Sequence, residues 1–272
     1  MNAAWLDRDA LVVSGPEATD YLQGQLSQDV TAVEVGASAW SWVLQPSGKV
    51  DALVRVTRTA DAWVLDTDAG FGAPLVARLN RFKLRTKVDI EAPAWRCLGL
   101  RGDDAEATGA DFEVAADATW GSLRGVDLFG PDLVVPPGAT LVEPADYEVT
   151  RILAGIPRMG AELTERTIPA ETGLVARTVS FTKGCFTGQE LVARIDSRGS
   201  NVPRHLRLLR TTGPIEVGAE LAAGDKVAGS VTSVARTEQE GWVGLGYVAR
   251  SVTPPAAVSG PHGVEVMVEE LS

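Results

Sequence analysis

The sequence has few residues of the kinds that bind metals. Among 272 residues it contains two cysteines, Cys97 and Cys185, and two histidines, His205 and His262, and no C-x-x-C pair occurs. A tetrahedral zinc site takes three or four nitrogen or sulfur ligands from the protein, so we expect no resident metal. Two cysteines also make no disulfide framework, which favours a reducing compartment. Cys97 alternates with apolar residues in a strand-like segment, so we interpret it as a packing residue.

Long hydrophobic runs are absent as well. A membrane-spanning helix needs about 18 or more consecutive apolar residues, and no such run occurs. The first residues, MNAAWLDRDALVV, contain no basic leader ahead of an apolar stretch, so we expect no secretory signal. We therefore expect a cytoplasmic protein that has no membrane partner.

Positive charge is scarce. The chain has 25 lysines and arginines against 36 acidic residues, which gives a formal net charge of −11. Nucleic-acid binding needs a positive footprint on phosphates, so we expect no nucleic-acid partner. The local exception is the segment RLNRFKLRTKV, residues 78–88, which holds five cations. This segment is either a solvated helix edge or a mouth for polyglutamate or for an acidic partner.

What the sequence does contain is an irregular mixture of short strands and helices. Residues 10–15 alternate like a strand, residues 38–56 like a hairpin, and residues 144–157 have helical spacing. This order favours the α+β class over a doubly wound sheet. From about residue 205 onward, short alternating runs with glycine and proline turns predict a small β-barrel. We expect domains at residues 1–200 and 203–272, because a single core rarely grows this large.

The stretch SFTKGCFTGQELVARIDSRG, residues 180–199, places Cys185 between a glycine and a phenylalanine and two residues after Lys183. Thr187 and Glu190 have the spacing of a capping box, which predicts a helix that starts just after Thr187. Cys185 would then lie near free backbone N–H groups and the positive end of the helix dipole. Together with Lys183, this setting favours the thiolate. The alternative is a buried cysteine in a tight turn.

The octet KGCFTGQE, residues 183–190, resembles the signature K-G-C-[FY]-x-G-Q-E of the YgfZ-type folate-binding proteins, which are relatives of the glycine-cleavage T-protein, an aminomethyltransferase. Further blocks resemble the same family, so the resemblance covers nearly the whole chain. They are DYLQGQLSQDV (20–30), RILAGIP (151–157), TIPAETGL (167–174), GSVTSVA (229–235) and GLGYV (244–248).

The resemblance implies two ferredoxin-like folate-binding subdomains around a central channel, plus a C-terminal β-barrel. It also implies a tetrahydrofolate-binding accessory factor for iron–sulfur cluster assembly or repair, in which Cys185 and Lys183 are the active residues. Its partners would be iron–sulfur client or assembly proteins, and we expect it to act as a monomer. Two alternatives stay open: a folate-dependent one-carbon (aminomethyl or methyl) transferase, and a thiol-redox protein without folate.

The resemblance also implies which residues contact folate. Glu171 matches the glutamate of the P-x-E block, whose carboxylate accepts the paired N–H groups of a pterin ring; its alternative is a solvated loop carboxylate. Tyr147 either faces the folate or is a core residue of its helix. Arg151 either orients the site or grips a carboxylate, or else braces a domain interface. Asp51 is the single aspartate where the T-protein has a G-G-x-x-D-D hairpin, which points away from glycine cleavage.

Overall fold

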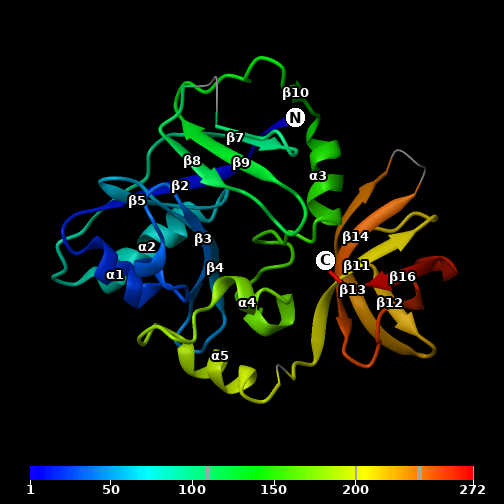
Figure 1. Cartoon of the computed structure of the whole chain (residues 1–272). Helices are drawn as coiled ribbons and strands as arrows, with labels where there is room; N and C mark the ends of the chain where they lie inside the picture. The colour runs from blue at the N-terminus through cyan, green and yellow to red at the C-terminus, as the bar shows by residue number, and fades with distance from the viewer. Residues whose placement is uncertain (108–110, 200, 238–240, 272) are drawn as a thin grey trace. The chain divides into compact units, whose positions relative to one another are not determined.

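The computed structural model describes residues 1–107, 111–199, 201–237 and 241–271 (Figure 1). Within these ranges the chain forms two compact units. Unit 1 comprises Met1–Val142 and Leu174–Ala193, and unit 2 comprises Glu143–Gly173 and Arg194–Ser272. Residues 143–173 therefore group with the barrel, although they precede it by many residues in the sequence. In the described ranges, no helix is both long enough and apolar enough to cross a bilayer.

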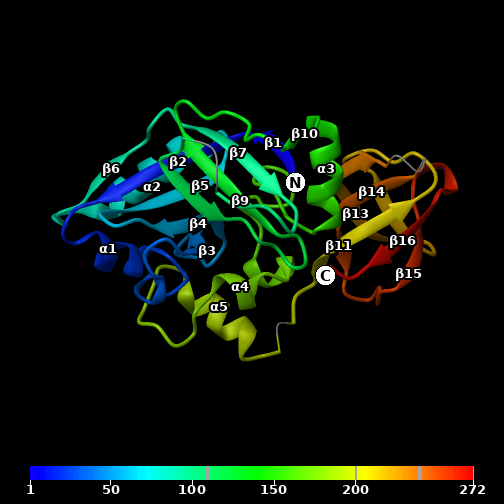
Figure 2. The same ribbon diagram turned by 45° about the horizontal axis from the view of Figure 1, so that its top comes forward.

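Unit 1 contains two open five-stranded sheets (Figures 1 and 2). The first has the order β10 (Thr140–Leu141), β1 (Asn2–Leu6), β7 (Arg96–Arg101), β9 (Gly125–Gly130), β8 (Val114–Asp117). The second has the order β3 (Ser38–Leu44), β4 (Val50–Arg58), β5 (Ala62–Asp68), β2 (Arg8–Ser14), β6 (Asp89–Glu91). β4 is buried along nearly its whole length, because the second sheet is covered on both faces.

Two helices cover one face of the second sheet, α1 (Ala18–Gln25) and α2 (Gly72–Lys83). The Tyr21 hydroxyl of α1 donates to the Leu79 carbonyl of α2 at 2.6 Å. A 3-10 turn at Val30–Ala32 follows α1. Two further helices of the chain lie near the thiol motif, α4 (Val175–Thr178) and α5 (Gln189–Asp196).

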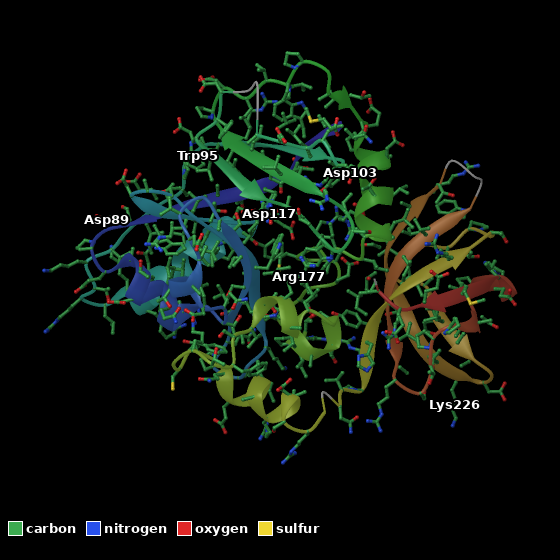
Figure 3. All side chains as sticks on the ribbon, viewed as in Figure 1. Asp89, Trp95, Asp103, Asp117, Arg177 and Lys226 are labelled. Atoms are coloured by element: carbon green, nitrogen blue, oxygen red, sulfur yellow. The ribbon has the colours of Figure 1, made fainter. Side chains whose placement is uncertain are left out.

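The other face of the second sheet packs on the first sheet. Their shared apolar core consists of Ala10, Val64, Cys97, Val114, Ala116 and Phe129. At one edge the backbone N–H of Asp117, at the end of β8, donates to the Ser38 hydroxyl of β3 at 3.0 Å (Figure 3). Cys97 is buried in this core, as expected for a packing residue.

A buried ionic network also joins the two sheets. Arg55 donates to both oxygens of Asp66 at 2.9 and 3.0 Å and reaches Asp127 of the first sheet at 2.8 Å. Asp127 also accepts a hydrogen bond from a second cation, Arg101, at 2.7 Å. Arg8 pairs with Asp66. Each charge has an opposite partner, which a buried charge requires. The periodicity of the strands gave no sign of this network.

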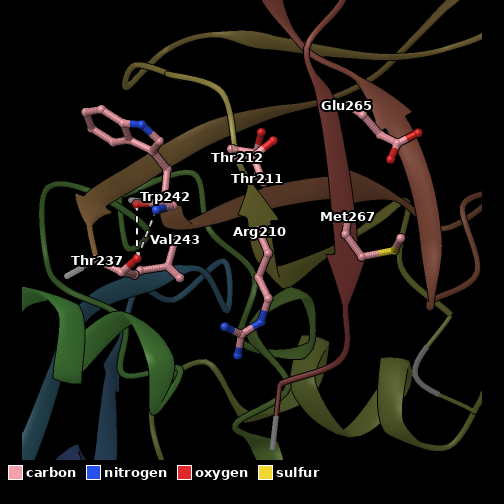
Figure 4. Close-up of a pocket in the computed structure, with 9 residues that line it drawn as sticks. Arg210, Thr211, Thr212, Thr237, Trp242, Val243, Glu265 and Met267 are labelled. Carbon is pink, nitrogen blue, oxygen red and sulfur yellow. Dashed lines mark hydrogen bonds between the residues drawn. The ribbon is translucent and has the colours of Figure 1, made fainter. Parts of the chain in front are cut away.

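Unit 2 is built on a closed six-stranded barrel with the order β11-β14-β13-β12-β15-β16. Its strands are β11 (Arg204–Thr211), β12 (Glu220–Ala223), β13 (Lys226–Arg236), β14 (Trp242–Ala249), β15 (Ala256–Ser259) and β16 (Glu265–Glu269). The helix α3 (Pro144–Leu153) packs on β13 and β14, and a 3-10 turn at Pro169–Thr172 contacts β11. A cavity of about 350 Å³ opens on the barrel, where Thr237 is hydrogen-bonded to the Gly241 backbone (Figure 4). The α+β class and the C-terminal barrel predicted from the sequence are confirmed.

Candidate functional site

Lys183, the first residue of the octet, is held in a cage of backbone carbonyls at the end of α1. Its ammonium donates to the carbonyl oxygens of Gln23, Leu26 and Gln28 at 2.6, 2.7 and 2.9 Å. The last carbonyls of a helix have no partner within the helix and carry the negative end of its dipole. An ammonium has three hydrogens, and all three are used here. Lys183 therefore caps α1 and fastens the octet to it.

The charge state of Lys183 follows from this cage. Burial lowers the pKa of Lys183 to about 8, and the carboxylate of Asp29 acts in the opposite direction. A neutral amine has only two hydrogens, so deprotonation would leave one of the three carbonyls without a donor. At neutral pH the side chain is thus the charged form that the cage needs. Because its hydrogens are committed, Lys183 does not donate a hydrogen bond to Cys185.

Hydrogen bonds hold the rest of the segment on the last turn of α1 and on the connection between α1 and β3. Ser180 N–H donates to the Ser27 carbonyl at 3.0 Å, and Thr187 N–H donates to the Gly24 carbonyl at 3.3 Å. The Ser27 hydroxyl donates to the Thr178 carbonyl at 2.6 Å. The segment is therefore anchored both before and after Cys185.

The second glycine of the octet allows the segment to approach the β3–β4 hairpin. Gly188 has a φ of +80°, and a Cβ there would lie 2.5 Å from the Gln45 carbonyl oxygen. On the hairpin side, a Cβ at Gly48 would lie 2.5 Å from the Cβ of Leu191. Any side chain at either position would force the two segments apart. By contrast, a Cβ at Gly184 would meet no atom within 4 Å, so the space beside Cys185 is open.

Cys185 is exposed, whereas Lys183 and Phe186 on either side of it are buried. The Lys183 ammonium lies 5.3 Å from the centroid of the Phe186 ring. These two inward side chains fix the turn, so the thiol between them faces solvent. The alternative of a buried cysteine is wrong. The helix expected just after Thr187 begins two residues later, at Gln189.

We expect Lys183→Met to loosen the thiol segment. The change keeps the length of the apolar stem but leaves three carbonyls without a donor, which should lower the free energy of unfolding by about 2–4 kcal/mol. Hydrogen exchange should accelerate in peptides that cover residues 180–190. Lys226→Met, at an exposed barrel position (Figure 3), is the control and should change neither quantity. Unchanged exchange in Lys183→Met would show that the cage does not order the segment.

In unit 2, Glu171 is a buried carboxylate. Its two oxygens accept from Nε and one terminal nitrogen of Arg204 at 3.1 and 3.2 Å, and one of them also accepts from Ile168 N–H at 3.3 Å. Burial makes the alternative of a solvated loop carboxylate wrong. Arg204 stacks over Tyr247 at 4.3 Å, and its side chain is 41% exposed. Tyr147, on α3, is half-buried.

Arg151 is a brace within unit 2. It donates twice to Glu148 at 2.9 and 2.7 Å, and it also donates to the Ile156 carbonyl, to Glu162 and to the Ser233 hydroxyl. A guanidinium has five N–H groups, and these contacts use all of them. In this arrangement Arg151 has no N–H left to grip a ligand carboxylate. It joins α3 to β13 instead.

Asp51 is the extra residue of a β-bulge. β3 and β4 pair Val43 with Ala52 and Leu44 with Val50, which leaves Asp51 without an opposite residue. Its carboxylate accepts from Arg78 of α2 at 3.1 Å. The bulge, which the sequence did not reveal, therefore turns Asp51 toward the helix-covered face of the second sheet.

Sequence reasoning missed Arg204 and the carbonyl cage. Arg204 lies 33 residues after its partner Glu171 and follows no motif. The cage consists of backbone atoms, which have no sequence signature at all. The one available signal was the helix end at residues 20–30, since a helix C-terminus attracts a cation.

Comparison with known proteins supports the resemblance. No family model matches this chain. The tRNA-modifying protein YgfZ of Vibrio vulnificus is 30% identical over 223 residues, which cover 75% of this chain and 68% of that protein. The chain belongs to the YgfZ family. The mitochondrial iron–sulfur cluster assembly factor IBA57 of Mus musculus is 26% identical over 301 residues, covering 98% of this chain and 81% of that factor.

The fold of this YgfZ family member is shared with a solved structure. The glycine cleavage system aminomethyltransferase T from Bartonella henselae matches it with a TM-score of 0.82 at 21% identity, covering 99% of this chain and 86% of that chain. At this identity the likeness shows the fold alone.

Proposed function

We propose that this protein is a tetrahydrofolate-binding accessory factor for iron–sulfur cluster assembly or repair, which acts through the Cys185 thiol. The observation that carries the proposal is the position of Cys185, exposed between two buried residues of the octet in a member of the YgfZ family. A thiol whose flanking residues are pinned is suited to contact a partner.

The residues favour an accessory factor over a protein with its own cluster. In the described part of the chain, no three histidine, cysteine or acidic side chains are grouped to hold a metal ion. An iron–sulfur cluster in transit would thus be cargo, bound by Cys185 together with ligands from a partner protein. This role agrees with the name of the mouse relative. The name of the Vibrio relative, a tRNA-modifying protein, fits the same role if the relative supports a tRNA-modifying enzyme that carries an iron–sulfur cluster. Direct contact between this chain and tRNA is disfavoured by its net charge of −11.

The chemistry of Glu171 fits a pterin ring. A guanidinium presents two parallel N–H groups to a carboxylate, and a pterin edge presents a ring N–H and an amino group in the same pattern. Arg204 shows that the Glu171 carboxylate accepts such a pair. Glu171 would orient the ring, and the more exposed Arg204 would give up at least one of its two hydrogen bonds. Tetrahydrofolate, when bound, supplies a reduced pterin that carries one-carbon units or electrons.

Glu171→Ala should weaken tetrahydrofolate binding by ~30- to 150-fold, or roughly 2–3 kcal/mol, because it removes a charge-assisted bidentate contact. Isothermal calorimetry on the full chain measures this. Glu216→Ala, at an exposed barrel position, is the matched control and should bind like wild type. Unchanged affinity in Glu171→Ala would remove this residue from the site, whereas no binding by wild type would remove folate from the proposal.

A turnover assay separates the accessory factor from the one-carbon transferase. Purified protein is incubated with tetrahydrofolate and glycine-type amines, and the folate products are followed. We expect binding without turnover. Product formation that depends on Asp51 would favour the transferase, because that aspartate occupies the hairpin position of the T-protein carboxylates.

A further inference from the structure

The outward face of α2 is apolar over its first half, ahead of the exposed polar residues Asn80 and Arg81. Ala73, Pro74 and Ala77 are exposed, while Leu75 and Leu79 on the opposite face are buried in the unit 1 core. A solvated helix normally presents charged or polar residues on its outward face. The small size of the three exposed residues also lets another chain approach the helix axis closely.

A cavity of about 340 Å³ lies beside this face. It is lined by Asp51, Ala52, Phe71, Pro74, Leu75, Ala77, Arg78 and Arg81. Each nitrogen of Arg78 donates one hydrogen bond, to Asp51, to Gln25 and to the Leu44 carbonyl, and the guanidinium stacks on Phe82 at 3.8 Å. The charge of Asp51 is therefore compensated within the cavity. Arg81, which also lines the cavity, is exposed, and its positive charge has no carboxylate partner among the described residues.

Beyond Arg81 the helix ends in a basic turn. Its cations Lys83, Arg85 and Lys87 lie close to Leu84 along the chain, and Leu84 is 89% exposed. Leu84 also has a φ of +47°, a left-handed conformation that costs a bulky residue energy and costs glycine none. Neither burial nor backbone geometry explains a leucine here.

The basic turn has a defined shape, and the carboxylate of Glu17 accepts a hydrogen bond from the backbone N–H of Lys87 rather than from a side-chain cation of the turn. Thr86 N–H donates to the Lys83 carbonyl at 2.9 Å, and Val88 is buried. Lys83 lies 3.9 Å from Asp89, which is 80% exposed (Figure 3). Over the residues that the structure describes, the side chains of Arg81, Arg85 and Lys87 have no ion-pair partner. Their charges are therefore available to another molecule.

We propose that the cavity, the outward face of α2 and the basic turn form one docking surface for an acidic segment of a partner protein. Charge complementarity selects such a segment, because a chain of net charge −11 repels acidic partners everywhere except at a local basic surface. Apolar side chains of the segment fill the cavity and contact Leu84, while its carboxylates meet Arg81, Arg85 and Lys87. This proposal uses neither Glu171 nor Cys185, although Asp51, the candidate carboxylate of the one-carbon transferase, lines part of the cavity.

The test uses the full chain and a fluorescein-labelled peptide in which pairs of glutamates alternate with single leucines, followed by fluorescence anisotropy. Wild type should bind with an affinity that falls as salt rises. Arg81→Glu with Arg85→Glu should weaken binding at least about tenfold. The matched charge reversal on the barrel, Lys226→Glu with Arg236→Glu, should leave the affinity unchanged. Ala77→Trp, which fills the cavity without changing charge, should also weaken binding about tenfold.

Three results would overturn the proposal. If the charge reversals on α2 and on the barrel weakened binding equally, the acidic peptide would be attracted to cations anywhere on the protein. Normal binding by Ala77→Trp would mean that no segment enters the cavity. Binding of oligo-γ-glutamate, which has no apolar side chains, as tightly as the peptide would identify a small-anion site instead.

Discussion

Cys185→Ser should fail to restore iron–sulfur enzyme activity when it is the only copy of the protein in the cell. The activity should equal that of cells from which the protein has been deleted. Serine fills the same space, and Cys185 is exposed, so the variant should fold normally and still bind tetrahydrofolate. A hydroxyl is a far poorer ligand for iron and a poorer nucleophile than a thiolate. The measurement is the activity of a cluster-dependent enzyme in extracts, with the amount of the variant checked in parallel.

Cys97→Ser is the internal control. Burial, with a further contribution from Asp127, raises the pKa of the Cys97 thiol well above its ordinary value, so this thiol is inert. The variant should keep its cellular function and lose only some stability. In wild type, an alkylating agent at neutral pH should modify Cys185 in the folded protein and Cys97 only after denaturation. Full cellular activity in Cys185→Ser would show that the thiol has no role in the function.

Asp127→Asn should be the most destabilising of the substitutions considered, at about 3–5 kcal/mol, because it breaks a buried pair and leaves charges uncompensated. Asp127 bridges Arg55 of one sheet and Arg101 of the other. Removal of its charge leaves two buried guanidinium groups with one carboxylate fewer. Urea denaturation followed by circular dichroism measures the loss. Asp103→Asn, at a fully exposed position, should cause no measurable change.

The same network predicts how acid affects the protein. Burial alone would raise the pKa of Asp127, but the cations of Arg101, Arg55 and Arg8 outweigh it and lower the pKa to about 2. The unfolded carboxyl protonates near its ordinary pKa of 3.8, while the folded one stays ionised. The stabilisation is therefore complete above about pH 4 and disappears as the pH falls toward 2. Between these values, wild type should lose stability more steeply than Asp127→Asn; equal slopes would contradict the network.

Local patterns in the sequence determined a large part of this protein. Two apolar runs joined at a turn predicted the hairpin at 38–56. Alternating apolar residues predicted the barrel strands, because a strand with one buried face must alternate. The octet at 183–190 indicated the family and singled out Cys185, because the order of its residues matches the family signature. For Cys185, however, the residues alone left a buried turn and an exposed thiol equally open.

Only the tertiary structure decided what the polar side chains contact. Lys183 lies 155 to 160 residues from the three carbonyls that bind it, and backbone carbonyls are the same in every sequence. Asp51 points toward α2 because β4 carries one residue more than β3 at this point. Such a bulge depends on the pairing of both strands, so neither strand's sequence reveals it alone. Glu171 became buried because Arg204 compensates its charge. Side-chain periodicity records which face of an element is apolar, whereas ion pairs and bulges depend on the element that lies opposite.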